Sequence, residues 1–239
     1  MFKTSALFAA ALSLAASAAV AAPGASAPGI SVSGPAAPAK AEGPWYGSEY
    51  VLGDPKAPVT VVEYASVVCP HCARFDADVF PKLKAKYVDT HKARYVLREF
   101  LTPPEDVAAT GFILARCRGE ADYLPMVEAI FKALPEMFAD GRGGNVAPTL
   151  MKVAAAHGIS HAQFDACLND PKASEAINKR IDQAIDVAKV TGTPTVFVNG
   201  RKVDPGLEEY NFAMLEKAID PLLAKGGSKT APTSKAKKH

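Results

Sequence analysis

Two cysteines separated by two residues are the side chains in this sequence best placed to do chemistry. Cys69 and Cys72 lie in the segment EYASVVCPHCARF, directly after an apolar, β-branched run that predicts a buried strand. Three kinds of site fit such a pair: half of a zinc site, a structural disulfide, or a redox-active dithiol. The remaining residues of the sequence distinguish among these three kinds of site.

The other two cysteines argue against zinc. Cys117 and Cys167 are single residues about fifty positions apart with no histidine pair, whereas a zinc site needs four ligands, usually two closely spaced pairs. A purely structural bridge between Cys69 and Cys72 would close too short a loop to restrict the unfolded chain much. The favoured interpretation is therefore a redox pair, with no bound metal.

Pro70 and His71, between the two cysteines, indicate how Cys69 becomes reactive. Proline suits the first position of a helix, so we expect Cys69 at the N-cap, where free N–H groups and the helix dipole stabilise a thiolate. His71 would add to this if it is protonated or donates its ring N–H. Cys72, one turn into the helix, should be less exposed. This assigns attack to Cys69 and resolution to Cys72, and a stabilised thiolate favours donation of the disulfide.

A second motif, VTGTPTVFVNG, places Pro194 directly before an apolar strand. Proline is tolerated at the start of a strand, and a cis bond between Thr193 and Pro194 would expose the Thr193 backbone beside the cysteines. An extended substrate chain could pair with that backbone whatever its sequence.

The hydrophobic pattern predicts the elements that position these residues. Strands are expected over 59–66 and 93–101, a helix that Pro81 kinks over 70–90, helices over 105–190, a hairpin at Asn199-Gly200, and a last helix over 207–223. The order β-α-β, helices, β-β-α predicts an α/β fold. We expect one sheet with helices on both faces and a helical block inserted between its halves.

Both ends of the chain predict segments outside this body. Residues 1–21 have an early lysine, an apolar run and small residues at the end, as in a cleaved secretory signal peptide; the run is too short and alanine-rich for a good membrane anchor. Residues 22–44 predict a disordered linker and residues 225–239 a flexible lysine-rich tail. Export implies an oxidising compartment. A formal net charge of +2 gives no case for a nucleic-acid partner.

These motifs together resemble the DsbA family of thioredoxin-fold thiol:disulfide oxidoreductases. The segments LGDPKAPVTVVEYAS, VVEYASVVCPHCARF and GTPTVFVNG carry the resemblance, which extends over roughly residues 45 to 224. It implies a thioredoxin-like domain made of residues 45–104 and 187–224, with an inserted helical domain at residues 105–186.

The resemblance also implies roles for individual residues. Cys69 is similar to the family's nucleophile and Cys72 to its resolving thiol, while Thr193 and Pro194 match the cis-proline turn. Glu63 matches a buried acid that accepts a proton from Cys72; the residues alone leave open whether it faces solvent.

Cys117 and Cys167 depart from the simplest members of the family. For these two residues we predict a structural disulfide, because similar additional bridges occur in DsbA-like proteins of alphaproteobacteria.

With the signal peptide, the resemblance implies a monomeric periplasmic disulfide oxidase without cofactor that acts on reduced exported proteins. A membrane quinone-linked oxidase of the DsbB type would reoxidise it. Two alternatives stay open: a disulfide isomerase or reductase, and a redox-inert peptide-binding chaperone on the same fold. Isomerases usually carry an N-terminal dimerisation domain, which the short linker does not provide.

Overall fold

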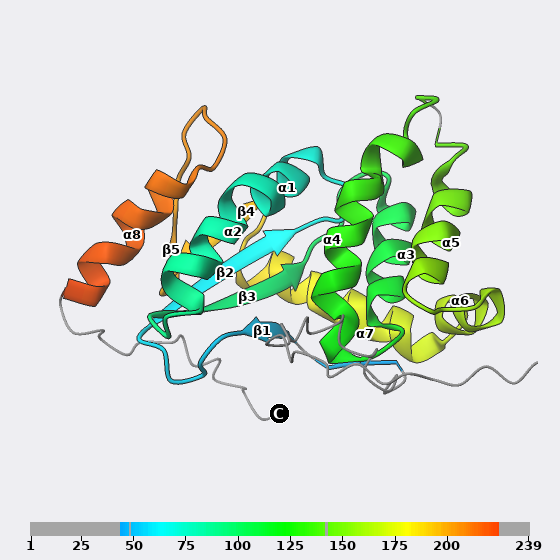
Figure 1. Cartoon of the computed structure of the whole chain (residues 1–239), viewed down its shortest axis with the longest axis horizontal. Coiled ribbons are helices and arrows are strands. Elements are labelled where there is room, and N and C mark those ends of the chain that lie inside the picture. Colours follow the sequence, from blue (N-terminus) through cyan, green and yellow to red (C-terminus); the bar gives the residue numbers. More distant parts are fainter. Residues whose placement is uncertain (1–43, 48, 142, 225–239) are drawn as a thin grey trace, which may run out of the picture. The chain divides into compact units, whose positions relative to one another are not determined.

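The computed structural model describes residues 44–47, 49–141 and 143–224. The predicted signal peptide, the tail and all of the linker except Pro44 therefore lie outside the described residues. Five strands form one sheet in the order β1-β3-β2-β4-β5 (Figure 1). Their bounds are Tyr50–Leu52 for β1, Val59–Ala65 for β2, Ala93–Glu99 for β3, Thr195–Val198 for β4 and Arg201–Lys202 for β5.

The pairing of the strands follows the predicted order of elements. β2 is parallel to β3 and antiparallel to β4, and β4 turns into β5. At that turn Asn199 and Gly200 have φ of 46° and 77°, which is the positive range that a tight hairpin needs and that these residue types tolerate. The pattern did not predict β1, which pairs antiparallel with β3 and is only three residues long.

The helical run after β2 is continuous but irregular. It consists of α1 (Pro70–Arg74), a π-helical turn η1 (Phe75–Val79), α2 (Phe80–Leu83) and a second π-helical turn η2 (Lys84–Val88). Pro81, which has no N–H, follows η1, where the Phe80 N–H bonds to the Phe75 carbonyl. The expected irregularity near Pro81 is thus taken up by a change in the hydrogen-bonding pattern.

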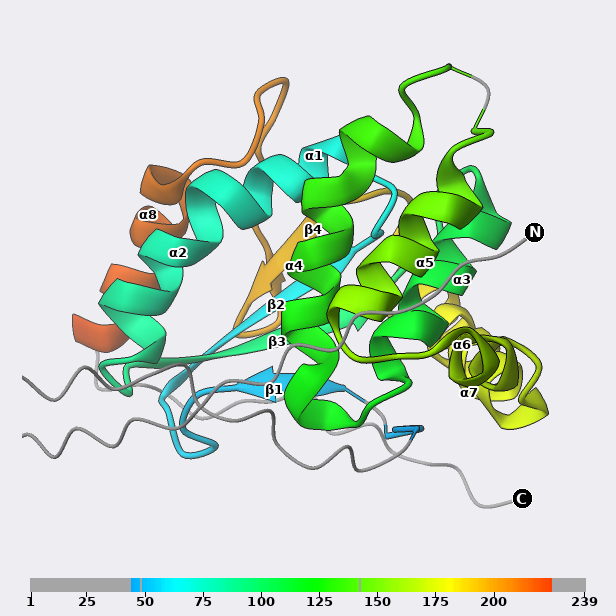
Figure 2. The ribbon, with the colours of Figure 1, turned by 45° about the vertical axis from the view of Figure 1, so that its right-hand side comes forward.

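A set of helices separates β3 from β4 in the chain. They are α3 (Glu105–Arg116), α4 (Glu120–Met137), α5 (Val146–Ala156), α6 (His161–Leu168), α7 (Pro171–Asp182) and the π-helical turn η3 (Gln183–Val187). In Figures 1 and 2, α3, α4 and α5 lie side by side next to the ends toward which β2 and β3 point. α4 also packs against α1. The last helix, α8 (Phe212–Ala224), packs against α2 and β2.

The two faces of β2 are covered by different parts of the chain. Val59, Val61 and Ala65 belong to the main core, together with residues of α1, α2 and α8. Tyr64 points to the opposite face, into a smaller cluster with Ala184 of η3. Because side chains alternate along a strand, Glu63 shares the face of Val61 and Ala65, beneath the helix that begins at Pro70. Within the described part of the chain, no helix is long and apolar enough to span a membrane.

Candidate active site

Cys69 lies at the point where the chain leaves β2 and enters α1. Its backbone is extended, with φ −86° and ψ 117°, and Pro70 takes the first position of the helix. The Cys69 N–H donates to the Ser66 carbonyl at 3.0 Å, which closes the turn between strand and helix. Cys69 therefore has the N-cap position expected from the motif.

The surroundings of Cys69 favour its thiolate. They lower its pKa from 9.0 to about 5, chiefly because the Cys72 thiol donates a hydrogen bond to its sulfur. Burial opposes this effect, whereas Thr193 and the backbone N–H groups of His71 and Cys72 add to it. At neutral pH the sulfur is thus a preformed thiolate, the reactive form in disulfide exchange.

Cys72 has the opposite character. The residue is fully buried, and burial is the main reason why its pKa lies well above 9.0. Its hydrogen bond to Cys69 and the negative charge of Glu63 raise the pKa further. The pair therefore holds one proton, which stays on Cys72 and is donated in a hydrogen bond to the Cys69 thiolate. The buried Cys72 thiol is out of reach of an incoming chain.

The turn at Thr193 and Pro194 lies directly against Cys69. The peptide bond between them is cis, and the Thr193 carbonyl oxygen is 3.4 Å from the Cys69 sulfur. Among the residues that the structure describes, the buried Thr193 hydroxyl has no hydrogen-bond partner. It can donate to the sulfur once the thiolate forms, and this contact contributes to the lowered pKa of Cys69.

Glu63 is buried beneath the two sulfurs, with 3% of its surface exposed. The Tyr95 hydroxyl donates to its carboxylate at 2.7 Å. Burial raises the pKa of Glu63 to about 8, an effect that the Tyr95 hydrogen bond offsets in part. The charges of Asp76 and Cys69 raise it too. Glu63 can therefore hold or release a proton near neutral pH.

Asp76 is a second acid near the cysteines, and its charge acts on Glu63. Burial, together with the charge of Glu128, raises the pKa of Asp76 to about 6. Asp76 lines an open cleft of about 490 Å³ between the α1–α2 run and α4, which Glu128 and Lys132 also line. Since Asp76 is one turn beyond Cys72, it lies on the helix face that carries the Cys72 thiol.

His71 lies beside the two sulfurs, but its ring points to other partners. The ring Nδ1 is 3.0 Å from Glu209 and 2.7 Å from the Arg74 guanidinium. Among the described residues, no hydrogen bond joins this ring to either cysteine. The contribution of His71 to the Cys69 thiolate comes instead from its backbone N–H.

Four further residues belong to this site and were not predicted from the sequence: Tyr95, Asp76, Arg74 and Glu209. The sequence did contain information that could have predicted Tyr95 and Asp76. Tyr95 pairs with Val61, two residues before Glu63 in the same parallel ladder, so it had to share a face with Glu63. Asp76 follows from helical periodicity. Glu209 gave no such signal, because it approaches from a loop more than 130 residues away.

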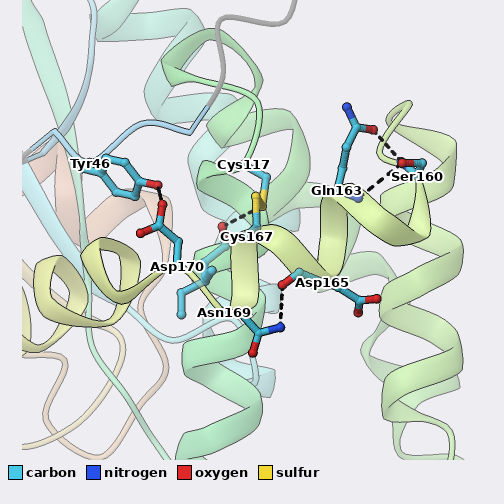
Figure 3. The surroundings of a disulfide bond; sticks show 9 residues. Tyr46, Cys117, Ser160, Gln163, Asp165, Cys167, Asn169 and Asp170 are labelled. Carbon is cyan, nitrogen blue, oxygen red and sulfur yellow. Dashed lines mark hydrogen bonds between the residues drawn. A yellow bond between two sulfur atoms is a disulfide. The ribbon is translucent and has the colours of Figure 1, made fainter.

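The predicted disulfide between Cys117 and Cys167 is present, and it joins the end of α3 to α6 (Figure 3). Both residues are almost fully buried. Around the bridge, Ser160 and Gln163 cap the start of α6 reciprocally, and the Tyr46 hydroxyl donates to Asp170. In Figures 1 and 2, α6 lies away from α1, so this bridge is separate from the reactive pair.

Comparison with known proteins agrees with this geometry. The profile of the thioredoxin family matches residues 46–221. A relative from Rickettsia typhi, whose name describes a protein-disulfide oxidoreductase, is 35% identical over 176 residues, which are 74% of this chain and 62% of the relative. The chain thus spans less than two thirds of that relative.

Two further similarities extend the comparison. A relative from Bacillus anthracis, named for disulfide bond formation, is 29% identical over 188 residues, covering 75% of this chain and 81% of the relative. The crystal structure of alpha-DsbA1 from Wolbachia pipientis superposes with a TM-score of 0.65 at 29% identity, covering 74% of this chain and 92% of that one. The predicted α/β class and thioredoxin fold are thereby confirmed.

Proposed function

This chain belongs to the thioredoxin family, among its DsbA-type members, and we propose that it is a thiol:disulfide oxidase that donates its Cys69–Cys72 disulfide to exported proteins. The observation that carries the proposal is the opposite acidity of the two thiols. Cys69 has a pKa of about 5, whereas that of Cys72 lies well above 9.0. A couple whose reduced form is stabilised in this way is a strong oxidant.

The reaction begins with the enzyme oxidised. A substrate thiolate attacks the Cys69 sulfur, a substrate–Cys69 disulfide forms, and the bond between Cys69 and Cys72 breaks. The Cys72 sulfur leaves with the electron pair and takes a proton, which Glu63 can supply because its pKa of about 8 keeps it largely protonated at neutral pH. The step thus creates the protonated, buried thiol that this site favours.

The second step releases the product. A second substrate thiol, as its thiolate, attacks the substrate sulfur of the mixed disulfide, and Cys69 leaves as a thiolate. A sulfur with so low a pKa is a good leaving group. The substrate has then lost two electrons and two protons, and the enzyme holds the electrons as the Cys69 thiolate and the Cys72 thiol.

The turn at Thr193 and Pro194 would orient the substrate. Its backbone lies within 3.4 Å of the Cys69 sulfur, so a substrate chain pairing with it would bring a cysteine to Cys69. Main-chain pairing tolerates many sequences, as an enzyme acting on many unfolded proteins requires.

The remaining parts of the proposal concern the setting of the reaction. We place the protein in the periplasm as a monomer, with reduced exported proteins as substrates and a membrane quinone-linked oxidase of the DsbB type as the partner that reoxidises it. The chemistry uses sulfur, carboxyl and hydroxyl groups of the chain itself and needs no cofactor. We also keep the division into a thioredoxin-like part (45–104 and 187–224) and a helical insertion (105–186).

Disulfide transfer to a reduced, unfolded test protein checks this function. The oxidised protein should lose one disulfide for each one formed in the substrate, measured by titrating free thiols, and Cys69→Ala should abolish transfer. The double variant Cys117→Ser with Cys167→Ser is the matched control and should retain it. Transfer that survives in Cys69→Ala, or faster reduction than oxidation of the test protein, would reject the oxidase and favour the chaperone or the reductase.

A further inference from the structure

A cluster of three charged or titratable side chains lies at the exposed start of the active-site helix. Glu209, in the loop between β5 and α8, accepts hydrogen bonds from both Nε and Nη2 of Arg74, with the Nε contact at 2.7 Å. The same carboxylate is 3.0 Å from Nδ1 of His71. The side chains of His71, Arg74 and Glu209 are 57%, 47% and 52% exposed, so solvent reaches all three.

The loop that carries Glu209 is fixed to the active site by its neighbour. The Tyr210 ring packs edge-on against Phe75, with ring centroids 6.1 Å apart. The Tyr210 hydroxyl donates to the Val203 carbonyl at 2.7 Å and accepts from the Val196 N–H at 3.3 Å. Glu209 is therefore held in place by contacts to the active-site helical run and to β4, which follows the cis-proline turn.

His71 occupies a position between a donor and an acceptor. Nη2 of Arg74, 2.7 Å from the ring Nδ1, can only donate, and an ionised Glu209 can only accept. A neutral ring with its proton on Nε2 pairs with Arg74, and a ring with a proton on Nδ1 pairs with Glu209. The ring thus keeps one position in either state.

We propose that Glu209 is a positioning residue that holds His71 and neutralises Arg74, and so limits how strongly the positive charge on the active-site helix stabilises the Cys69 thiolate. The inference rests on the proposed function in one respect, since it takes Cys69 as the sulfur that forms the mixed disulfide with the substrate. According to this proposal, a residue in a loop distant in sequence adjusts the reactivity of the Cys69 sulfur.

The charged and titratable groups around Cys69 give the sign of the effect. On its own helical run these are Cys72, His71 and Arg74, together with Asp78, which interacts with Arg74. From β2 comes Glu63, and from the β5–α8 loop Glu209. Arg74 interacts electrostatically with Cys69 and is paired with Glu209, so its field at the sulfur is partly cancelled. Without Glu209, the positive charge of Arg74 should act on the Cys69 sulfur at full strength. Without Arg74, that stabilisation of the thiolate should be absent.

Titration of the Cys69 thiolate in the reduced protein, by its ultraviolet absorbance, tests the proposal. Glu209→Gln should lower the midpoint and Arg74→Gln should raise it, each by a few tenths of a pH unit, the size expected for one exposed charge nearby. The double variant should titrate close to the wild type. All differences should shrink in high salt, because exposed charges are screened.

Asp89→Asn is the matched control. Asp89 is 51% exposed, pairs with Lys84, and lies fifteen residues beyond Arg74 along the same helical run. It should leave the midpoint unchanged.

Two results would overturn the proposal. An unchanged midpoint in Glu209→Gln would show that Glu209 has no influence on the sulfur. A raised midpoint would show that Glu209 acts by supporting a positive charge on His71 rather than by cancelling Arg74. The titration uses no substrate, so it can fail or succeed independently of the disulfide-transfer assay that tests the proposed function.

Discussion

Cys69 and Cys72 have the same side chain, and their surroundings give them opposite acidities. Cys69 caps a helix and accepts hydrogen bonds, which brings its pKa to about 5. Cys72 is buried one turn further on and donates its proton, so its pKa is raised. Each sulfur stabilises the state of the other, and the pair forms a unit that favours one thiolate and one thiol.

Glu63 gives a prediction in which stability depends on pH. Its pKa is about 8 in the folded protein against 4.5 when unperturbed, so protonation stabilises the fold. That contribution is fully present below pH 4.5 and is lost as the pH rises through 8. Glu63→Gln keeps a neutral group that can still accept from Tyr95. The free energy of unfolding of this variant should exceed that of the wild type by an amount that grows from pH 4.5 to 8 and reaches on the order of 2–3 kcal/mol at pH 7.

Urea unfolding of the reduced proteins at several pH values measures this difference. Glu208→Gln, which changes an exposed carboxylate in the loop before α8, should show no such trend. A difference between Glu63→Gln and the wild type that stays constant with pH would mean that Glu63 is ionised in the fold throughout.

At the level of residues, the sequence predicted those that a local motif defines. Pro70 placed Cys69 at the N-cap, and the structure agrees. Glu209 and the partner of Glu63 could not be predicted in this way, because long-range contacts bring them in. The direction of the His71 ring depends on Glu209 and was not predictable for the same reason.

At the level of elements, the alternation along β2 decides which acid lies beneath the active site. Val59, Val61, Glu63 and Ala65 share one face, and α1 covers it. Strand alternation was visible in the sequence, but the choice of the buried face was not. The short β1 and the π-helical turns were also missed, since three-residue strands and changes of helical pitch leave little periodicity to detect.

The packing of α3 against the active-site loop gives a second prediction. A Cβ on Gly111 would lie 2.7 Å from a methyl group of the buried Val67, two residues before Cys69. Alanine is the better helix former by about 1 kcal/mol, but overpacking typically costs about 1–3 kcal/mol. We expect Gly111→Ala to lower the free energy of unfolding by about 1 kcal/mol.

Urea unfolding again provides the measurement. Gly192→Ala is the control, because a Cβ there meets nothing within 4 Å and its φ is not positive. This variant should be neutral or slightly stabilising. A Gly111→Ala protein as stable as the wild type would contradict the close contact between α3 and the loop.

At the level of the whole molecule, one feature ties the helices between β3 and β4 to the sheet, and a second ties two of these helices to each other. Glu99 of β3 is fully buried and accepts from Arg116 of α3 and Arg180 of α7. The Cys117–Cys167 bridge follows directly after Arg116 and closes a loop with a sequence separation of 50. In the chain-entropy view, a loop of that length contributes about 4 kcal/mol at most. The sequence suggested the bridge through family resemblance, whereas nothing in it predicted that Glu99 pairs with two arginines.

The reduction potential of the Cys69–Cys72 couple tests the central claim most directly. A fall in the Cys69 pKa from 9.0 to about 5 stabilises the reduced form about a hundredfold at pH 7. For a two-electron couple this corresponds to about 60 mV. Equilibration with glutathione buffers should therefore give a potential well above that of thioredoxin, about −270 mV. A value at or below that of thioredoxin would contradict the account of this site as a donor of disulfides.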